Sequence, residues 1–135
     1  MTNAKTNPAP DPDALDADTL TSFRGRLRQE RADLLARNES RLTGVLDADD
    51  AVTDEAEHAV ADNERAMSLR LADKDRKLLS LIDHALGKFE TGEFGLCEGT
   101  GELIERARLE LRPWARYSVE YKMVLERERA LHAGG

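Results

Sequence analysis

The sequence predicts a mainly α fold, in which a long antiparallel coiled-coil hairpin precedes a small globular region and a C-terminal helix. Composition is the first reason, because aromatic residues make up 4% and charged residues 35% of the 135 residues. Most apolar residues are leucine or alanine, as is typical of long helices and coiled coils. The second reason is periodicity, since apolar residues recur at helical steps through two long segments joined by a short polar link.

Residues 1–16 are predicted to form a disordered N-terminal tail. They include three of the four prolines of the chain, together with several small polar residues. Such a segment buries too little apolar surface to offset the entropy that it would lose on ordering.

Residues 17–90 are predicted to form the hairpin. Its first helix runs from about Asp18 to Leu46, and its second from the Ala51–Asp54 region to about Glu90. At ~1.5 Å per residue the second helix is about 60 Å long, and the short link favours an antiparallel pair that projects from the rest of the chain. The residues expected at the interface are Leu20, Phe23, Leu27, Leu34, Leu42 and Leu46 on the first helix, and Val60, Met67, Leu71, Leu78, Ile82, Ala85 and Phe89 on the second.

Residues 91–135 are predicted to form the globular region and the last helix. Gly92 suits the left-handed conformation that commonly follows a helix. Beyond it we expect a short helix over Glu102–Leu111, which a proline stops, and a final charged helix over Ala115–Leu131. The aromatic residues expected to fill this end are Trp114 and Tyr117.

Charge and composition favour a protein partner in the cytoplasm. The net charge is −7 and the isoelectric point is near 5.0, so nucleic-acid phosphates would repel the chain. One cysteine cannot form an internal disulfide, and no apolar run approaches the ~20 residues of a membrane span. The N-terminus lacks the apolar core of a signal peptide. We therefore expect a cytoplasmic monomer without sequence-specific DNA binding or membrane contact.

The sequence contains no pattern typical of an enzyme. It has no glycine-rich phosphate loop and no nucleophile elbow. None of the histidines, His58, His84 and His132, is paired with a second ligand-type neighbour at a convincing spacing, so surface or packing roles are expected rather than ligand or base roles. Cys97 lacks a nearby His–Asp pair and is expected to pack as a small hydrophobic residue. The prediction is a non-enzyme without catalytic residues.

The predicted turn of the hairpin is strongly acidic. Residues 47–64 hold eight carboxylates and no lysine or arginine. A calcium loop that began at Asp47 would place Val52 where a glycine is needed and His58 where a bidentate glutamate is needed, which excludes an EF-hand. Two interpretations remain: a solvated hairpin end kept soluble by its charge, or a rod that delivers carboxylates to a basic or metal-containing target.

Four residues have the spacing of a four-cysteine zinc site, C-x2-C-x17-C-x2-C, but only the first is a cysteine. They are Cys97, Thr100, Ser118 and Tyr121. Zinc requires deprotonated, electron-rich ligands, and neutral hydroxyls and a phenol are poor ones. The sequence therefore predicts a degenerate zinc-finger-like region that holds no structural zinc, and no other metal site.

The segment between the two half-sites, G-E-L-I-E-R-A-R-L-E-L-R-P, together with the preceding F-G-L-C-E, closely resembles the zinc finger of the DksA/TraR family of bacterial transcription factors. The resemblance extends upstream through ADKDRKLLSLIDHALGKFETGEFG to D-E-A-E-H-A, which matches the tip motif D-x-x-D-x-A of that family with Glu57 in place of the second aspartate. It covers roughly residues 18–130. The joint loss of three cysteines is similar to the zinc-less paralogues of the family.

The resemblance implies a protein that binds RNA polymerase rather than DNA. It implies insertion of the coiled coil into the secondary channel, where the tip near residues 47–59 would destabilise open promoter complexes. By position, the tip role falls to Asp54, Glu57 and Ala59. Contacts with the polymerase rim fall to Arg70, Lys74 and Lys77, although basic residues on an exposed helix are usually only solvated.

The resemblance also implies a response to the alarmone ppGpp as a co-effector at the polymerase interface. Arg112 and Lys122 match two of the basic positions that bind it, whereas Leu81 stands where the family has a lysine. We therefore expect weaker phosphate affinity at this site.

Two other functions remain as alternatives. One is a helical interaction module that does not act on RNA polymerase. The other is an elongation factor of the Gre type, whose tip carboxylates position a metal for transcript cleavage, although its hairpin usually precedes a β-rich domain.

Overall fold

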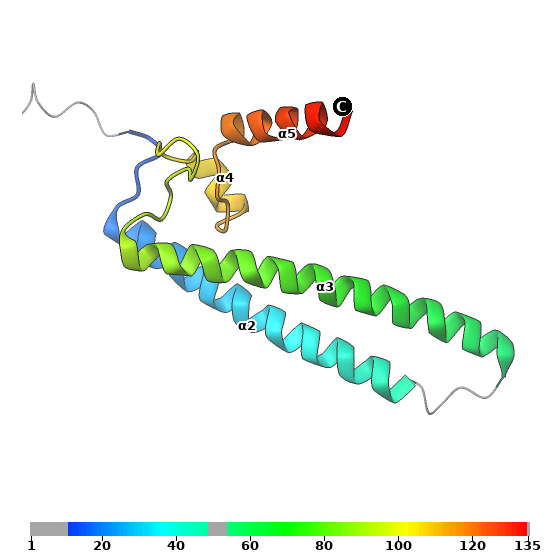
Figure 1. Cartoon of the computed structure of the whole chain (residues 1–135). Helices are drawn as coiled ribbons and strands as arrows, with labels where there is room; N and C mark the ends of the chain where they lie inside the picture. The colour runs from blue at the N-terminus through cyan, green and yellow to red at the C-terminus, as the bar shows by residue number, and fades with distance from the viewer. Residues whose placement is uncertain (1–10, 49–53, 135) are drawn as a thin grey trace, which may run out of the picture.

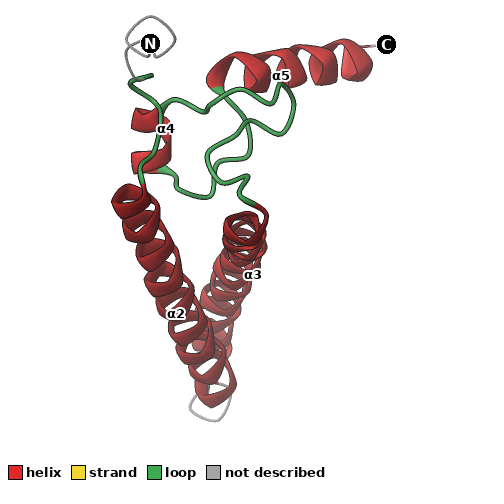
Figure 2. Ribbon diagram, turned by 90° about the vertical axis from the view of Figure 1, so that its left-hand side faces the viewer, coloured by secondary structure: helices red, strands yellow, loops and turns green. Residues whose placement is uncertain are grey.

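The computed structural model describes residues 11–48 and 54–134 and confirms the mainly helical fold (Figure 1). Helix α2 (Ala17–Ala48) and helix α3 (Glu55–Thr91) form the long antiparallel hairpin. Helix α4 (Arg106–Leu111) lies in the globular end, and helix α5 (Val119–Gly134) stands apart from the hairpin, as Figure 2 shows. Within the described ranges the only β pairing is an isolated antiparallel bridge between Leu96 and Leu103, so the C-terminal part is not a β-rich domain.

The ends of α3 are fixed by local sequence. Asp54 precedes the helix in an extended conformation, and its carboxylate accepts the backbone N–H of Glu57 at 2.8 Å, as an N-cap does. Gly92 ends the helix with φ of 75°, and its N–H donates to the carbonyl of Lys88. These caps agree with the helix start and end expected from the sequence.

The core lies where the hairpin meets the globular end. Phe94 from the loop after α3 stacks on Phe89 with ring centroids 4.2 Å apart and lies 5.7 Å from the ring of Phe23. Each fully buried Leu or Ile in this cluster contributes about 1.5–3 kcal/mol. The buried members are Phe23, Leu27, Leu34, Ile82, Ala85, Phe94, Cys97, Ile104 and Leu109, and Trp114 and Tyr117 pack against them.

The predicted apolar interface is wrong toward the tip of the hairpin. Val60, Met67 and Leu71 are 58%, 50% and 40% exposed, and Leu42 on the opposite helix is exposed as well. Next to this exposed region the interface between the two helices is polar. The buried carboxylate of Asp75 lies there between the helices. It accepts hydrogen bonds from two arginines of α2, at 3.0 Å from Arg37 and 2.8 Å from Arg41.

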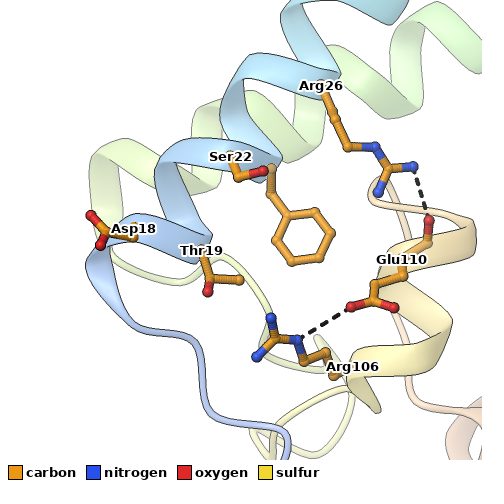
Figure 3. Close-up of a pocket in the computed structure, with 7 residues that line it drawn as sticks. Asp18, Thr19, Ser22, Arg26, Arg106 and Glu110 are labelled. Carbon is orange, nitrogen blue, oxygen red and sulfur yellow. Dashed lines mark hydrogen bonds and ion pairs between the residues drawn. The ribbon is translucent and has the colours of Figure 1, made fainter.

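The N-terminal segment and α4 are joined to the base of the hairpin. Figure 3 shows Arg26 of α2 and Arg106 of α4 pointing toward Glu110. The Arg26 guanidinium donates to the carbonyl oxygen of Glu110 at 2.9 Å, and Asp13 accepts the backbone N–H of Arg106 at 2.9 Å. Residues 11–16, part of the segment expected to be disordered, thus have defined contacts, while residues 1–10 of that segment lie outside the described residues.

Two helices begin later than the sequence predicts. Helix α4 begins at Arg106 rather than Glu102, because Leu103 pairs with Leu96 and Ile104 donates its N–H to the carbonyl of Gly95 at 2.7 Å. Helix α5 begins at Val119 rather than Ala115, because the preceding residues pair with the loop that carries Cys97. None of the described helices is long and apolar enough to cross a membrane.

Candidate functional site

The tip residues that the sequence singles out lie at the start of α3, farthest from the globular end. Asp54, Glu57 and Ala59 are all exposed. The carboxylate of Asp54 is used as the helix cap, so its position is fixed, whereas the side chain of Glu57 projects from the first turn. Two carboxylates at a helix N-terminus are favoured by the helix dipole. The rest of the acidic link, residues 49–53, lies outside the described residues.

The three basic residues expected at a polymerase rim lie on one exposed face of α3. Arg70, Lys74 and Lys77 are separated by four and three residues, which places them on adjacent turns of the same face. Lys77 forms an exposed pair with Asp73 at 3.4 Å, a contact too solvated to contribute much stability. The face is therefore available for a partner.

The four residues with zinc-finger spacing are brought together by two loops. Cys97 lies in the first loop, where its backbone N–H donates to the carbonyl of Glu102 at 2.7 Å and its carbonyl accepts the N–H of Gly101 at 2.8 Å. The second loop pairs with the first through the N–H of Glu98 and the carbonyl of Arg116, at 2.8 Å. Backbone hydrogen bonds therefore join the two loops in this arrangement.

Cys97 is more than the small apolar residue that the sequence predicts. Its side chain belongs to the core and is 1% exposed. Burial raises the pKa of the Cys97 thiol, but hydrogen bonds from the Thr100 hydroxyl and from nearby backbone N–H groups, that of Ser118 first among them, lower it to about 7. These loops thus surround the sulfur with donors, as suits a thiolate.

Tyr121 packs on the loop that carries Cys97, at Gly99. Its ring lies so close to Gly99 that a Cβ atom at that position would collide with three of the ring carbons. Its backbone N–H donates to the Ser118 hydroxyl at 3.2 Å, which caps the start of α5. Two of the four zinc-finger positions are therefore engaged in packing and capping that a metal-ligand role would disrupt.

A cluster of charges around Glu98 joins the loop to α3 and to the second loop. One carboxylate oxygen of Glu98 lies 2.8 Å from the ammonium of Lys88 and 2.7 Å from the ring nitrogen of His84. The other accepts two hydrogen bonds from the Arg116 guanidinium, at 3.0 and 3.1 Å. Burial raises the pKa of the Glu98 carboxyl, but its three basic partners outweigh this effect and lower the pKa to about 2.

The three residues expected near ppGpp line one cavity. Leu81 comes from α3, Arg112 from the end of α4 and Lys122 from α5, and the cavity between them measures about 450 Å³. This volume is within the range of small-molecule sites. The other lining residues include three more cations and two aromatic rings, and no carboxylate is among them: Arg108, Trp114, Ala115, Arg116, Tyr117, Leu125 and Arg129.

The cations of this cavity are not equally available. Arg116 is paired with Glu98, and Arg108 donates to the carbonyl of Tyr117 at 2.9 Å. Arg112, Lys122 and Arg129 form no ion pair with any carboxylate in the described ranges. The cavity therefore concentrates unneutralised positive charge within a protein of net charge −7, which is an arrangement suited to an anion.

Sequence reasoning missed the contacts of Glu98 and the place of Arg129 in the wall of the cavity. Both could have been suspected from helical spacing: His84 and Lys88 are four residues apart, so they can bind one carboxylate together. Lys122 and Arg129 are seven residues apart, which places them on the same face of α5. Glu98 itself lies in a loop, where no helical periodicity marks it.

Comparison with protein families gives matches over both halves of the chain. Residues 19–89 match the model of the N-terminal domain of the DnaK suppressor protein DksA. Residues 92–120 match the model of the prokaryotic dksA/traR C4-type zinc finger. The two matches follow one another along the chain in the same order as the hairpin and the globular end.

Individual relatives are similar over most of their length. The chain is 37% identical over 113 residues to the RNA polymerase-binding transcription factor DksA of Caulobacter vibrioides, covering 84% of this chain and 80% of the relative. It is 32% identical over 115 residues to the protein of that name in Escherichia coli K12, covering 85% and 76%. The solved structure of transcription factor DksA2 from Pseudomonas aeruginosa is similar with a TM-score of 0.77 and 33% identity, covering 96% of this chain and 99% of that one.

Proposed function

The chain belongs to the DksA family of RNA polymerase-binding transcription factors, and we propose that it regulates transcription initiation by binding RNA polymerase through the secondary channel. The observation that carries this proposal is the separation of charges along α3. Its start presents exposed carboxylates, its exposed middle presents a basic face, and its last turns join the globular end. A rod with this arrangement can be held by its base and side while it presents acid groups at its far end.

In this proposal the basic face of α3 docks on the polymerase rim and the tip acts afterwards. Arg70, Lys74 and Lys77 would contact acidic groups around the channel entrance. The carboxylates of Asp54 and Glu57 and the small side chain of Ala59 would then approach the catalytic centre and shorten the life of open complexes. Such a role needs no catalytic residue in the factor itself.

The test separates docking from the effect of the tip. Asp54→Asn removes the charge but keeps a good N-cap, because asparagine and aspartate cap helices about equally well. Glu57→Gln removes the second charge at nearly unchanged helix propensity. We expect both variants to bind core RNA polymerase within a few-fold of the wild type and to reduce its effect on open-complex lifetime. Failure of the wild type to co-purify with core polymerase would favour the alternative of a helical module with another partner.

We propose that the protein works without zinc, although its family has a C4 zinc finger. The residues do not fit the metal, because one thiol, two hydroxyls and a phenol replace four thiolates. In addition, the hydroxyl of Ser118 is occupied in capping α5, and the ring of Tyr121 is packed on Gly99. We expect less than stoichiometric zinc by elemental analysis and an unchanged melting temperature in a chelator. One zinc ion per chain would contradict this.

We further propose that the cavity between α3, α4 and α5 binds a phosphate group of ppGpp when the factor is docked. Arg112 and Lys122 both line it, and its unneutralised charge supports an anionic ligand. In this reading the factor acts in the cytoplasm, where its polymerase partner works, and binds no specific DNA sequence. The test is the dependence of open-complex lifetime on ppGpp with factor at saturation, measured against polymerase alone and against Arg112→Ala.

A further inference from the structure

The position of Leu81 leaves the cavity without a cation from α3. Leu81 lies on the wall that α3 contributes, and the cavity has no other residue from that helix. The positive charge must therefore come from the remaining walls. Helix α5 contributes three residues to them, Lys122, Leu125 and Arg129, at successive steps of three and four.

Arg129 is a suitable replacement because its charge is not used elsewhere in the described structure. It forms no ion pair with a described carboxylate, although three glutamates share its helix. None of these glutamates lines the cavity. Arg127, only two residues earlier, does not line it either, so only one of the two neighbouring arginines of this helix is directed to the site.

An arginine can bind a phosphate group in this cavity as a lysine would, and its hydrogen bonds to the phosphate are better defined in direction. The guanidinium offers two parallel N–H groups that match two oxygens of one phosphate, whereas an ammonium acts as a point charge. Three cations without acidic partners repel one another, and an anion with several negative charges relieves that repulsion. A guanosine polyphosphate has both the charge and the phosphate oxygens to do so.

We propose that Arg129 supplies the third phosphate-binding cation of this cavity, from α5, in place of a basic residue on α3. This inference rests on the proposed ppGpp site and extends it. It assigns Arg129 a specificity role toward polyphosphates. It also predicts that a lysine at position 81 on α3 can replace Arg129 and restore most of the sensitivity to ppGpp.

The experiment measures the ppGpp concentration that gives half of the maximal effect on open-complex lifetime, with factor saturating and the response of polymerase alone subtracted. Arg129→Ala is expected to raise this concentration at least about tenfold, as the loss of a charge-assisted hydrogen bond would. Arg127→Ala is the matched control on the same helix and is expected to leave it within twofold. The double variant Leu81→Lys with Arg129→Ala is expected to recover most of the sensitivity.

Two further readouts distinguish this role from a structural one. Inhibition without ppGpp and the melting temperature are expected to be the same for Arg129→Ala and the wild type. If Arg129→Ala behaves like Arg127→Ala while Lys122→Ala loses sensitivity, the assignment of Arg129 is overturned and the proposed ppGpp site stands. If the wild type binds polymerase but does not respond to ppGpp, both the site and the assignment fall, while polymerase binding stands.

Discussion

The carboxylate of Glu98 lies 2.8 Å from the ammonium of Lys88, and this contact ties the loop of the globular end to the last turns of α3. Lys88 is, with Asp75, one of two charged side chains that are buried among the residues whose burial the structure describes. A buried ammonium without a partner would cost several kcal/mol, so the pair is required wherever the loop packs on the helix. The Glu98 carboxylate is therefore one of the contacts that hold the globular end on the hairpin, together with the packing of Phe94 on Phe89.

The first prediction concerns pH. The pKa of Glu98 is about 2 in the folded protein, lower than in the unfolded chain, so the ionised carboxylate stabilises the fold above the unfolded pKa near 4.3. This stabilisation is lost as pH falls from about 5 through 2. Because the side chain is 24% exposed and solvent screens it, we expect about 1–2 kcal/mol. Urea unfolding of wild type and Glu98→Gln from pH 7 to pH 3 measures it.

The free energies of unfolding of the wild type and of Glu98→Gln should approach each other as the pH falls. At pH 7 Glu98→Gln is expected to be the less stable protein, because its amide leaves Lys88 buried without a counter-charge. At pH 3 the difference should be smaller. A constant difference across the whole range would mean that the charge of Glu98 does not stabilise the fold.

The second prediction concerns the contact between Gly99 and Tyr121. Gly99→Ala should destabilise the protein by about 1–3 kcal/mol, because its new methyl group overlaps the tyrosine ring and displaces it. Gly87→Ala is the control, since no atom lies near a Cβ there and alanine favours the helix by about 0.5–1 kcal/mol. In a double-mutant cycle with Tyr121→Ala, most of the cost of Gly99→Ala should disappear. Additive losses would contradict the overlap.

The third prediction compares two aspartates of α3. Asp75 is buried between two arginines of α2, and Asp73 forms an exposed pair with Lys77. Asp75→Ala should destabilise the hairpin by roughly 3 kcal/mol, because it leaves the partly buried Arg41 without its carboxylate partner. Asp73→Ala should cost less than about 0.5 kcal/mol. Chemical denaturation at pH 7 measures both, and equal effects would show that the buried triad does not hold the helices together.

The fourth prediction concerns docking on polymerase. Lys74→Glu should weaken binding about 3- to 30-fold at low salt and by less at high salt, because contacts between exposed charges are screened. Arg28→Glu on the exposed surface of α2 makes the same change of charge away from the proposed face and should have little effect. Fluorescence titration with core polymerase at two salt concentrations tests this. A loss that does not depend on salt would indicate a different cause.

The hairpin could be predicted because its signals are local. The cap at Asp54, the glycine at the end of α3 and the step of three and four between apolar residues are all visible within a few turns of sequence. The same periodicity gave a wrong prediction of the interface toward the tip, where Val60 and Met67 continue the apolar stripe but are exposed. Burial at Asp75 depends on arginines of the other helix, which no local pattern reveals.

The globular end could be predicted only in outline. The four positions with zinc-site spacing were found from the sequence pattern, and Leu81, Arg112 and Lys122 were found from the family resemblance. The structure places these three residues around one cavity, while their function remains a proposal. The contacts that fix this end join residues far apart in sequence, as Glu98 with Arg116 does. Each such pair depends on how the loops fold, and backbone pairing of Leu96 with Leu103 also displaced the expected start of α4.

The contact of Tyr121 with Gly99 joins two segments that leave the ribosome at different times during synthesis. The hairpin is made of neighbouring helices and can pair once Thr91 has left the ribosome, whereas the loop of Cys97 waits for residues near the C-terminus. A nascent or truncated chain therefore has its acidic rod before it has a closed base. The cavity draws its walls from residues between Leu81 and Arg129, so it can form only after Arg129 has left the ribosome.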